Sequence, residues 1–471
     1  MNISNLKRSK NQKKLSSICF VLFSAWMLSF TFEGPLLYSL VENANIDPSK
    51  YIFIAIIGHF LGLFSGGFIV KKQVTAKMTM IVSILICLAG TLMFFLRFSI
   101  VWYITLIIIA IFAGLFISSS GFYFKTYSRT EIRHKTIADV LIYANIIMIM
   151  INVVTVNVSA KISLMLEVSI LIAALVASFM LEADSEKKII YKTEDLTKLP
   201  SIFKPFLILC IFITIITINS GIMYQVVTPA YGQYELLASY YWAVPYILAL
   251  WILRNLSDKY NRAYILYIAL AMIGLSYIAF MWLDTSVTSY LIINTLMLGA
   301  FGVCDMFWWS IMGSFFDYSE NPAKILGIGL SMNVLGILIG GFIGNKVFFV
   351  KGDYTNASII ALIIVFFVIM VLPLLNAQLT NLLQTHVFLV RFSRIIESEQ
   401  EQTIQTSKYS NQLTEKEKEV VKLLLRGYTY KGIAENLFIT ENTMKYHTKN
   451  IYQKLNINSK MELIKLFLEK E

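Results

Sequence analysis

Close to the C-terminus, basic, amide and aromatic side chains recur at intervals that place them on one face of a helix. Asn442, Lys445 and Lys449 are three and four residues apart, and Tyr446 lies beside Lys445. Residues three or four apart are neighbours on a helix surface, so these four side chains form one outward face. Ammonium, amide and phenol groups on such a face can donate hydrogen bonds to phosphates and to base edges in the major groove. The spacing therefore predicts a surface that binds nucleic acid.

The residues around this face predict the short helices that would hold it. Thr414 and Glu417 form a capping box that begins a first helix, and Gly427 marks the end of that helix. A second short helix follows, and Thr440 is an N-cap residue for the third. The apolar positions predicted to face inward are Val420, Val421, Leu424, Leu425, Ile433, Ala434, Leu437, Met444, Ile451 and Leu455. The pattern is typical of a helix-turn-helix, in which the third helix presents its polar face to the major groove.

Residues 413–468 closely resemble the LuxR-type helix-turn-helix family. The matching residues are Leu413, Thr414, Glu417, Glu419, Val420, Gly427, Ile433, Ala434, Leu437, Thr443, Met444, Lys445, His447, Ile451, Lys454 and Leu455. The resemblance implies that Lys445, Tyr446 and Lys449 occupy base-facing positions. It implies that Thr443 and His447 lie near the DNA backbone. It also implies that the fourth helix, residues 461–468, forms a dimer surface, so we expect a homodimer that reads two half-sites.

The chain departs from the family pattern at three positions. Met444 replaces the usual Val, and Asn456 stands where a Gly often ends the recognition helix. Asn tolerates the left-handed conformation that this position requires. Lys460 stands where Arg is common, which would weaken a phosphate contact.

The charge of this segment does not decide between DNA binding and an ordinary solvated surface. Residues 413–471 hold 11 Lys and Arg against 8 Asp and Glu. Such a modest excess is common on short, exposed helices, so it indicates little about nucleic acid. The motif spacing is the observation that favours DNA as the partner.

Most of the chain is too apolar for a soluble protein. Of 471 residues, 57% are hydrophobic and 15% are charged, whereas soluble domains carry about 25% charged residues. Apolar runs of the length that crosses a hydrocarbon core recur twelve times. They lie near residues 16–40, 51–70, 77–96, 99–123, 137–158, 162–182, 205–227, 235–253, 263–283, 287–313, 324–348 and 357–379. The predicted fold class is all-α, with a twelve-helix transmembrane bundle followed by a small four-helix domain.

Lys and Arg are unequally divided between the two sides of this bundle. The N-terminal segment and one set of alternate loops hold 21 of them, and the opposite set holds 5. Because positive loops stay in the cytoplasm, we expect a multi-pass protein of the cell membrane with both termini cytoplasmic. The first apolar run is too long for a signal peptide and is interpreted as a retained span.

The polar stretch 183–204 separates six spans from six, which resembles the major facilitator architecture. That family's Gly-x-x-x-Asp-Arg-x-Gly-Arg-Arg signature is largely absent after the second span. It is better preserved between the eighth and ninth spans, as Arg254, Asp258, Lys259 and Arg262. Loss of the first copy puts active transport in doubt.

The predicted domains follow from these boundaries. They are the membrane halves 1–182 and 205–380, the central loop 183–204, the segment 381–412, and the DNA-binding domain 413–471. Within 381–412 we expect an amphipathic helix at 381–396 on the inner leaflet and then a flexible linker.

Ionisable side chains inside the predicted spans are candidates for ligand binding. Glu33, His59, Glu167 and Asp305 lie in four different runs. A central cavity between the halves would be lined by Glu33, Asn219, Tyr224, Tyr241, Asp305 and Trp308. The alternative is that these residues belong to interfacial aromatic belts or act as polar contacts between helices.

Catalytic and metal-binding patterns are not apparent. The four Cys lie in separate apolar runs, no Cys or His cluster has metal-ligand spacing, and no phosphate-binding loop or receiver domain precedes the tail. We expect no enzyme activity, cofactor or metal. The leading hypothesis is a one-component sensor in which a small molecule or a membrane state controls DNA binding. A transporter with a regulatory tail is the alternative, and a protein-interaction tail is a third, less favoured one.

Overall fold

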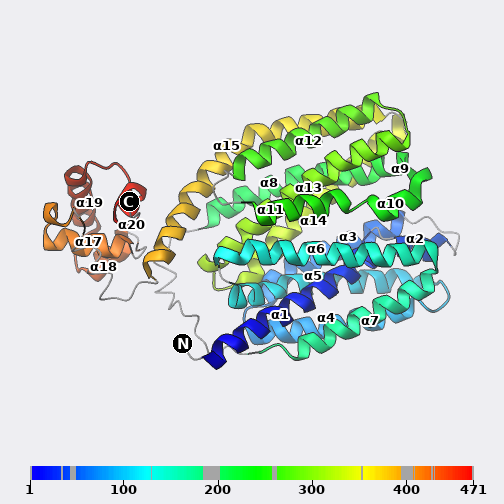
Figure 1. The fold of residues 1–471 in the computed structure, drawn as a ribbon, viewed down its shortest axis with the longest axis horizontal. Helices are drawn as coiled ribbons and strands as arrows, with labels where there is room; N and C mark the ends of the chain where they lie inside the picture. The colour runs from blue at the N-terminus through cyan, green and yellow to red at the C-terminus, as the bar shows by residue number, and fades with distance from the viewer. Residues whose placement is uncertain are drawn as a thin grey trace. The chain divides into compact units, whose positions relative to one another are not determined.

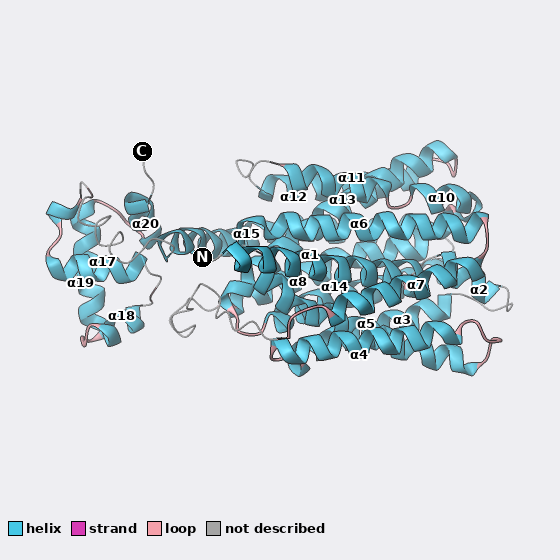
Figure 2. Ribbon diagram, turned by 60° about the horizontal axis from the view of Figure 1, so that its bottom comes forward, coloured by secondary structure: helices cyan, strands magenta, loops and turns pink. Residues whose placement is uncertain are grey.

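The computed structural model describes residues 3–32, 35–42, 49–128, 130–183, 202–256, 262–351, 354–393, 407, 409–425, 428 and 430–468. Helices make up nearly all of these residues, and no strand occurs among them (Figures 1 and 2). The chain divides into two units. The first comprises Met1–Ser185 and Leu207–Leu372, and the second comprises Glu186–Phe206 and Pro373–Glu471.

The N-terminal half of the membrane unit holds seven α-helices and one π-helical turn among its described residues. They are α1 (Ile3–Trp26), the π-helical turn η1 (Met27–Thr31), α2 (Pro35–Glu42), α3 (Ser49–Ile69), α4 (Gln73–Met93), α5 (Ile100–Tyr127), α6 (Thr130–Asn157) and α7 (Ala160–Phe179). The first predicted span is therefore an α-helix, a π-helical turn and a short helix, because backbone bonding changes register at Met27.

The C-terminal half follows the same plan with more interruptions. It holds α8 (Phe203–Ile222), the π-helical turn η3 (Met223–Val227), α9 (Thr228–Ala230), η4 (Gly232–Tyr234), α10 (Glu235–Tyr241), α11 (Val244–Asn255), α12 (Arg262–Trp282), α13 (Val287–Phe315), η5 (Phe316–Tyr318), α14 (Pro322–Lys351) and α15 (Tyr354–Ser393). One continuous helix, α15, stands where the sequence predicts a last span and a separate helix at 381–396. It passes through Pro373, so the helix expected at 381–396 continues directly from the last span as far as Ser393.

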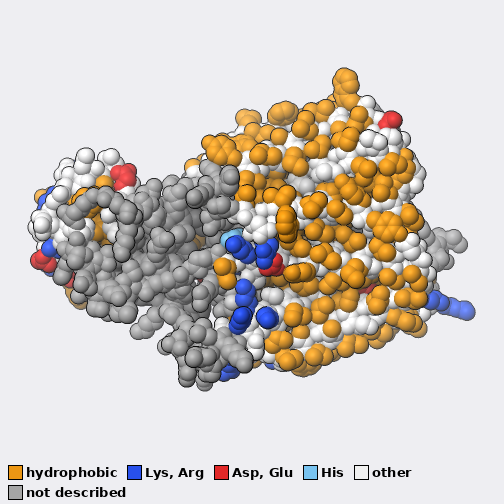
Figure 3. Space-filling model, viewed as in Figure 1, with side chains coloured by type: hydrophobic (Ala, Val, Ile, Leu, Met, Phe, Trp, Pro, Cys, Tyr) orange, Lys and Arg blue, Asp and Glu red, His pale blue; other side chains and the backbone are white. Residues whose placement is uncertain are grey.

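Length and composition mark most of these helices as membrane-crossing. Among the described residues, eleven helices are long and apolar enough to span a bilayer, and the apolar part of α3, Phe53–Ile69, is shorter. Every predicted span therefore has a helix at its position. Large apolar side chains face outward, with Met370 79% and Phe366 64% exposed. Figure 3 shows hydrophobic side chains over the flank of the bundle, as expected where lipid is the solvent.

Close helix packing joins the halves. In the N-terminal half α3 lies against α5, and it also contacts α14 of the C-terminal half, while α6 contacts α11 and α13. A Cβ atom on Gly62 would stand 2.0 Å from the Ile111 carbonyl oxygen, and one on Gly114 would stand 2.4 Å from the Leu63 nitrogen. Only glycine permits these backbones to approach so closely, which is a common device in membrane helix pairs.

The tail unit contains a separate helical domain with its own core. After the 3-10 turn η6 (Ser410–Gln412), its helices are α17 (Glu415–Leu425), α18 (Tyr430–Asn436), α19 (Glu441–Leu455) and α20 (Lys460–Leu468). The buried residues include Val420, Leu424, Ile433, Met444 and Ile451, each fully or almost fully shielded from solvent. The four predicted helices are confirmed. Most of the predicted linker 397–412, and Gly427, lie outside the described residues.

Candidate DNA-binding surface and membrane-buried polar sites

The N-terminus of α17 is tied to α19 through one carboxylate. Thr414 N donates to Glu417 Oε2 at 2.8 Å, and Glu417 N donates to Thr414 Oγ1 at 3.3 Å, which confirms the predicted capping box. Lys454 of α19 donates to both oxygens of the same carboxylate, at 2.9 and 2.7 Å. The Glu417 side chain is only 5% exposed. It therefore fixes the angle between the first helix and the helix that carries the predicted DNA-binding face.

Both ends of α19 are capped as the sequence predicts. Thr440 Oγ1 accepts from Thr443 N at 3.1 Å. Asn456 adopts the left-handed conformation at φ 53°, and Ile457 N donates to Tyr452 O across it. This is the C-terminal arrangement in which Gly or Asn is favoured.

The turn before α19 uses the same arrangement with an unfavourable residue. Phe438 has φ 53° and is 96% exposed, while Ile439 N donates back to Ala434 O at 2.9 Å. A bulky side chain at positive φ is strained by contact between its Cβ and the backbone. The strained conformation of Phe438 therefore lowers the stability of this domain.

The outward face of α19 carries the predicted contact residues. Thr443, Lys445, Tyr446 and Lys449 are exposed, Tyr446 to 64%, and His447 is partly exposed beside the Tyr446 ring. On the opposite side Met444, Thr448, Ile451 and Leu455 are buried. All five predicted side chains thus lie on one helix.

An acidic residue on the same helix holds one of the predicted contacts. Lys445 Nζ lies 3.0 Å from Glu441 Oε1, one turn earlier in α19, and both side chains are about half exposed. The pair is solvent-exposed and therefore weak. It positions the ammonium group while leaving it able to move to a phosphate or base.

Two titratable groups away from this face, Glu417 and Lys460, have lowered pKa values for different reasons. Burial acts to raise the Glu417 pKa, but hydrogen bonds from Lys454 and Thr414, together with the Lys454 charge, hold it below its ordinary value. Burial lowers the pKa of Lys460 to about 8, and its Nζ donates to Tyr428 O at 3.1 Å. The Lys460 ammonium group is therefore held against the Tyr428 carbonyl and does not extend freely into solvent.

In the membrane unit, the structure connects only part of the predicted cavity set. Tyr246 Oη donates to Asp305 Oδ2 at 2.6 Å, and half-buried Tyr224 lies within electrostatic range of Tyr246. The Tyr241 hydroxyl is 2.7 Å from Thr295 Oγ1. Tyr246 of α11 thus contacts Asp305 of α13, while the Tyr241–Thr295 pair lies ten residues earlier along α13.

The remaining cavity residues are buried or not described. Asn219 is fully shielded and, among the described residues, both its amide atoms lack partners, as does Trp308 Nε1. Glu33 lies outside the described residues, as do Asp258 and Lys259 of the loop signature. Buried polar atoms of this kind are candidates for contact with water or ligand.

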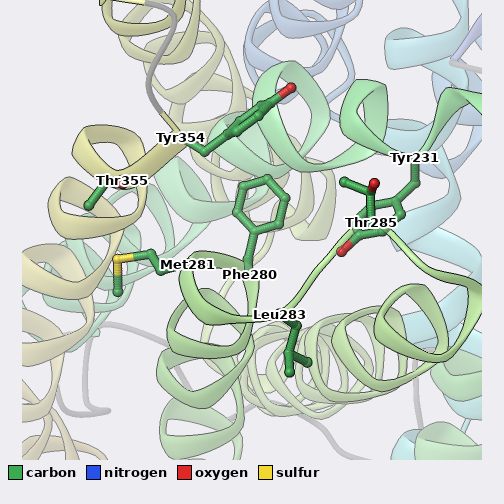
Figure 4. A pocket seen from close by; sticks show the side chains of 7 residues that line it. All are labelled: Tyr231, Phe280, Met281, Leu283, Thr285, Tyr354 and Thr355. Atoms are coloured by element: carbon green, nitrogen blue, oxygen red, sulfur yellow. The ribbon is translucent and has the colours of Figure 1, made fainter.

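The structure has an open pocket elsewhere, at the loop between α12 and α13. It is lined by Tyr231, Phe280, Met281, Leu283, Thr285, Tyr354 and Thr355 (Figure 4). The Phe280 ring is 5.3 Å from the Tyr354 ring and 6.2 Å from the Tyr231 ring. Its lining is distinct from the residues around Asp305.

Comparison with known families identifies the tail. Residues 411–467 match the model of the bacterial regulatory proteins of the luxR family. The C-terminal domain is a LuxR-type helix-turn-helix domain. Helix α19 is the third helix of this domain.

Curated relatives match this chain through the LuxR-type domain. The oxygen regulatory protein NreC of Staphylococcus carnosus is 42% identical over 59 residues, which are 12% of this chain and 27% of that protein. DegU of Brevibacillus brevis is 34% identical over 87 residues, 17% and 37% respectively. The nitrate/nitrite response regulator NarL of Escherichia coli K12 is 40% identical over 57 residues, 12% and 26%. The chain thus matches well under half the length of these relatives.

Solved structures match the membrane unit instead. The human organic anion transporter MFSD10 aligns with 76% of this chain and 99% of its own, with a TM-score of 0.60 and 12% identity. The proton:xylose symporter XylE aligns with 79% and 96%, with a TM-score of 0.57 and 13% identity. The membrane unit therefore has the major-facilitator-like fold, fused to a LuxR-type domain.

Some side chains that organise these sites gave little signal in the sequence. Lys454 belongs to the LuxR-type pattern, but its bond to Glu417 depends on how α17 and α19 pack. Tyr246 lies in an apolar helix, where a tyrosine is ordinarily read as an interfacial residue. Only the fold places its hydroxyl on Asp305.

Proposed function

We propose that this protein is a membrane-embedded one-component transcription regulator. Its LuxR-type domain binds DNA through Thr443, Lys445, Tyr446, His447 and Lys449, and its major-facilitator-like unit senses a small molecule or a membrane signal. The observation that carries the proposal is the exposed face of a capped recognition helix in a domain of a bacterial regulatory family. The proposed regulator lies in the cell membrane with both termini cytoplasmic, as the loop charges favour.

A dimer is the proposed DNA-bound form. Regulators of the helix-turn-helix type read two half-sites with a symmetric pair of domains. Helix α20, which ends the LuxR-type domain, is the proposed pairing surface. The proposed membrane unit controls the pairing equilibrium of the two tails, because a change that favours pairing raises affinity for a two-half-site operator.

Sensing is proposed to use the polar group around Asp305. Ionisable groups inside a membrane bundle are costly, so they mark ligand or ion sites by default. Asp305 is bonded to Tyr246, and Asn219 and Trp308 supply buried donors that lack partners among the described residues. A ligand that prefers one arrangement of the halves would shift their equilibrium by its difference in affinity.

The test of DNA binding is a gel shift with the intact protein in lipid nanodiscs and DNA from its own upstream region. We expect salt-sensitive, sequence-selective binding that is abolished in the Lys445→Glu, Lys449→Glu double variant. Each lysine contact should contribute about 1–3 kcal/mol. The matched control is Lys416→Glu, an exposed lysine on α17, which should bind within about twofold of the wild type. Equal binding by wild type and double variant would refute the assignment.

The test of sensing measures operator affinity across a panel of anionic, cationic and neutral small molecules. We expect one class to change the affinity of the wild type, and Asp305→Asn to remove that response without changing binding in its absence. Identical affinity under every condition would refute sensing.

A second candidate function keeps transport as the main activity, with the tail as feedback control. It is favoured by the full-length match of the membrane unit to transporter structures. It predicts accumulation of a substrate in vesicles that contain the protein, with or without DNA.

A further inference from the structure

A buried carboxyl in the N-terminal half has one polar neighbour among the described residues. Glu167 of α7 has no exposed surface, and Ser29 Oγ, in the π-helical turn η1, contacts its Oε1. The other oxygen, Oε2, has no hydrogen-bond partner among the described residues. The residues lining this part of the bundle, such as Trp26, Phe30 and Leu171, are fully buried and largely apolar.

Ser29 has one hydroxyl proton and two possible acceptors, and this indicates whether the Glu167 carboxyl is neutral or ionised. Ser29 Oγ lies 2.6 Å from the Ala25 carbonyl oxygen, which can only accept. A hydroxyl carries one proton, so Ser29 cannot donate to Ala25 and to Glu167 at once. If the Ser29 hydroxyl donates to the Ala25 carbonyl, the close contact between Ser29 and Glu167 requires a proton on the Glu167 carboxyl. A neutral Glu167 then donates to Ser29, and Ser29 donates to Ala25.

The ionised form cannot keep this chain of hydrogen bonds. A carboxylate accepts at both oxygens, and among the described residues the Ser29 hydroxyl is the donor within reach. Ser29 would have to turn away from Ala25, where the first helix changes from α-helix to π-helical turn. Such turns lie often at functional sites, because their bonding is readily rearranged.

The described titratable groups on the surrounding elements supply no counter-charge. Helices α1, α2, α4, α5 and α6 and the turn η1 lie around α7 and Ser29. Their titratable groups, with those of α7, are Lys7, Arg8, Lys10, Lys13, Lys14, Cys19, Tyr38, Glu42, Lys77, Cys87, Tyr103, Tyr123, Lys125, Tyr127, Glu131, Arg133, His134, Lys135, Asp139, Tyr143 and Lys161. Among those whose side chains the structure describes, none acts electrostatically on Glu167, whose polar contact there is Ser29. Glu33 lies outside the described residues.

The hydrogen bonds of Lys77 and Cys19 show how far these two groups lie from Glu167. Lys77 is bound to the carbonyls of Phe179 and Leu181, at least twelve residues along the chain from Glu167. At helical rise this is about 18 Å. The Cys19 thiol donates to the Ala174 carbonyl, two turns from Glu167.

We propose that Glu167 and Ser29 form a proton-binding site in the N-terminal half, and that release of the proton rearranges the π-helical turn. The reaction is the transfer of one proton between the Glu167 carboxyl and water, with no other bond made or broken. The protonation state of this site makes the conformation of the membrane unit depend on the local proton concentration. This inference goes beyond the proposed function, since it holds whether or not the tail responds to it.

The experiment is infrared difference spectroscopy of the intact protein in lipid vesicles, between about pH 5 and pH 10, a range above the ordinary glutamate pKa. We expect a carboxylic-acid C=O band at neutral pH that is lost at the alkaline end. Glu167→Gln should remove the band, and Ser29→Ala should shift its frequency because the acid loses its acceptor. Asp305→Asn is the matched control and should leave this band in place.

Hydrogen exchange of the segment around Ser29 is the second measurement. After division by the intrinsic, base-catalysed exchange rate, we expect protection to fall in the wild type at alkaline pH and to stay constant with pH in Glu167→Gln, which mimics the protonated form. A spectrum unchanged by Glu167→Gln would overturn the proposal, as would a band that persists across the whole range. Both readouts are independent of DNA, so they separate this site from failure of the regulator.

Discussion

Arg133 and Asp317 form a two-point ion pair that joins the two halves of the membrane unit, with N–O distances of 3.1 and 3.2 Å. Arg133 begins α6, and Asp317 lies in the turn after α13. The guanidinium is 4% exposed and also donates to the carbonyls of Gly313 and Ser128. A second pair, Arg254 with Asp139, connects α11 and α6 but is about one-third exposed. The same end of the two halves is thus held by one buried and one exposed pair.

We predict that Asp317→Asn destabilises the membrane unit far more than Asp139→Asn. Removing one partner of a buried pair leaves an uncompensated charge and costs about 3 kcal/mol, whereas an exposed pair contributes less than about 1 kcal/mol. Thermal unfolding in lipid nanodiscs should show a Tm several degrees lower for Asp317→Asn, and little change for Asp139→Asn. Equal Tm values for the two variants would show that burial of Arg133 does not matter.

The Glu417 carboxyl makes the stability of the LuxR-type domain depend on acid. Its folded pKa lies below the unfolded value because the Lys454 and Thr414 hydrogen bonds outweigh burial. Its contribution is therefore complete above the unfolded pKa of about 4.3 and is lost as the pH falls through the folded pKa. Glu417→Gln should lower the free energy of unfolding at neutral pH by about 1–2 kcal/mol. Urea unfolding followed by circular dichroism checks this, with exposed Glu415→Gln as the control.

Lys460 also makes the stability of this domain rise with pH, but in the alkaline range. Its folded pKa of about 8 is lower than that of a free lysine, so the unfolded chain binds more protons between the two values. Stability should rise by roughly 1 kcal/mol from about pH 7 to about pH 9. The rise should vanish in Lys460→Met. Above about pH 10 the gain should be opposed by Tyr452, whose pKa burial raises, because the unfolded tyrosine ionises there.

Phe438 is predicted to cost the LuxR-type domain stability. Its φ of 53° is unfavourable for a side chain with a Cβ, and 96% exposure means that little packing is lost on its removal. Phe438→Gly should raise the free energy of unfolding by up to about 1 kcal/mol. The control Phe438→Ala keeps the Cβ and should not gain. A loss of stability in Phe438→Gly would mean that the exposed ring makes a contact that outweighs the strain.

Glu441 is predicted to weaken DNA binding slightly. It pairs with Lys445 and adds a negative charge to the proposed DNA-binding face. Glu441→Gln should lower Kd about twofold, in proportion to an exposed i,i+4 pair. Lys449→Ala should raise Kd for the operator and relax discrimination at one base pair, by about 1–3 kcal/mol, because the proposed contact of Lys449 is with a base edge. Fluorescence anisotropy with the operator and with single-base variants of it measures the effect of both substitutions. Unchanged discrimination in Lys449→Ala would place that lysine away from the bases.

Local patterns in the sequence predicted much of the fold. Apolar runs indicated the membrane helices, because a segment in lipid must satisfy its backbone hydrogen bonds internally. Thr440 and Asn456 marked the ends of α19, since capping depends on the residues at each end. These features are set within a few turns of chain, which is the range that sequence patterns report.

Long-range pairs were beyond those patterns. Arg133 and Asp317 are 184 residues apart, and Ser29 and Glu167 are 138 apart. The structure alone shows that the last span and the helix expected at 381–396 are one continuous helix, α15, as far as Ser393.

By itself, the sequence determined that the chain is helical, that most of it belongs in a bilayer, and that its last sixty or so residues form a LuxR-type domain with a polar recognition face. The physical reason is that hydrophobicity, helix period and capping act over short distances. The tertiary structure decided which charged and polar groups meet: Arg133 with Asp317, Tyr246 with Asp305, Lys454 with Glu417, and Glu167 with Ser29. Those pairings depend on how separate helices pack, and packing is a property of the whole fold.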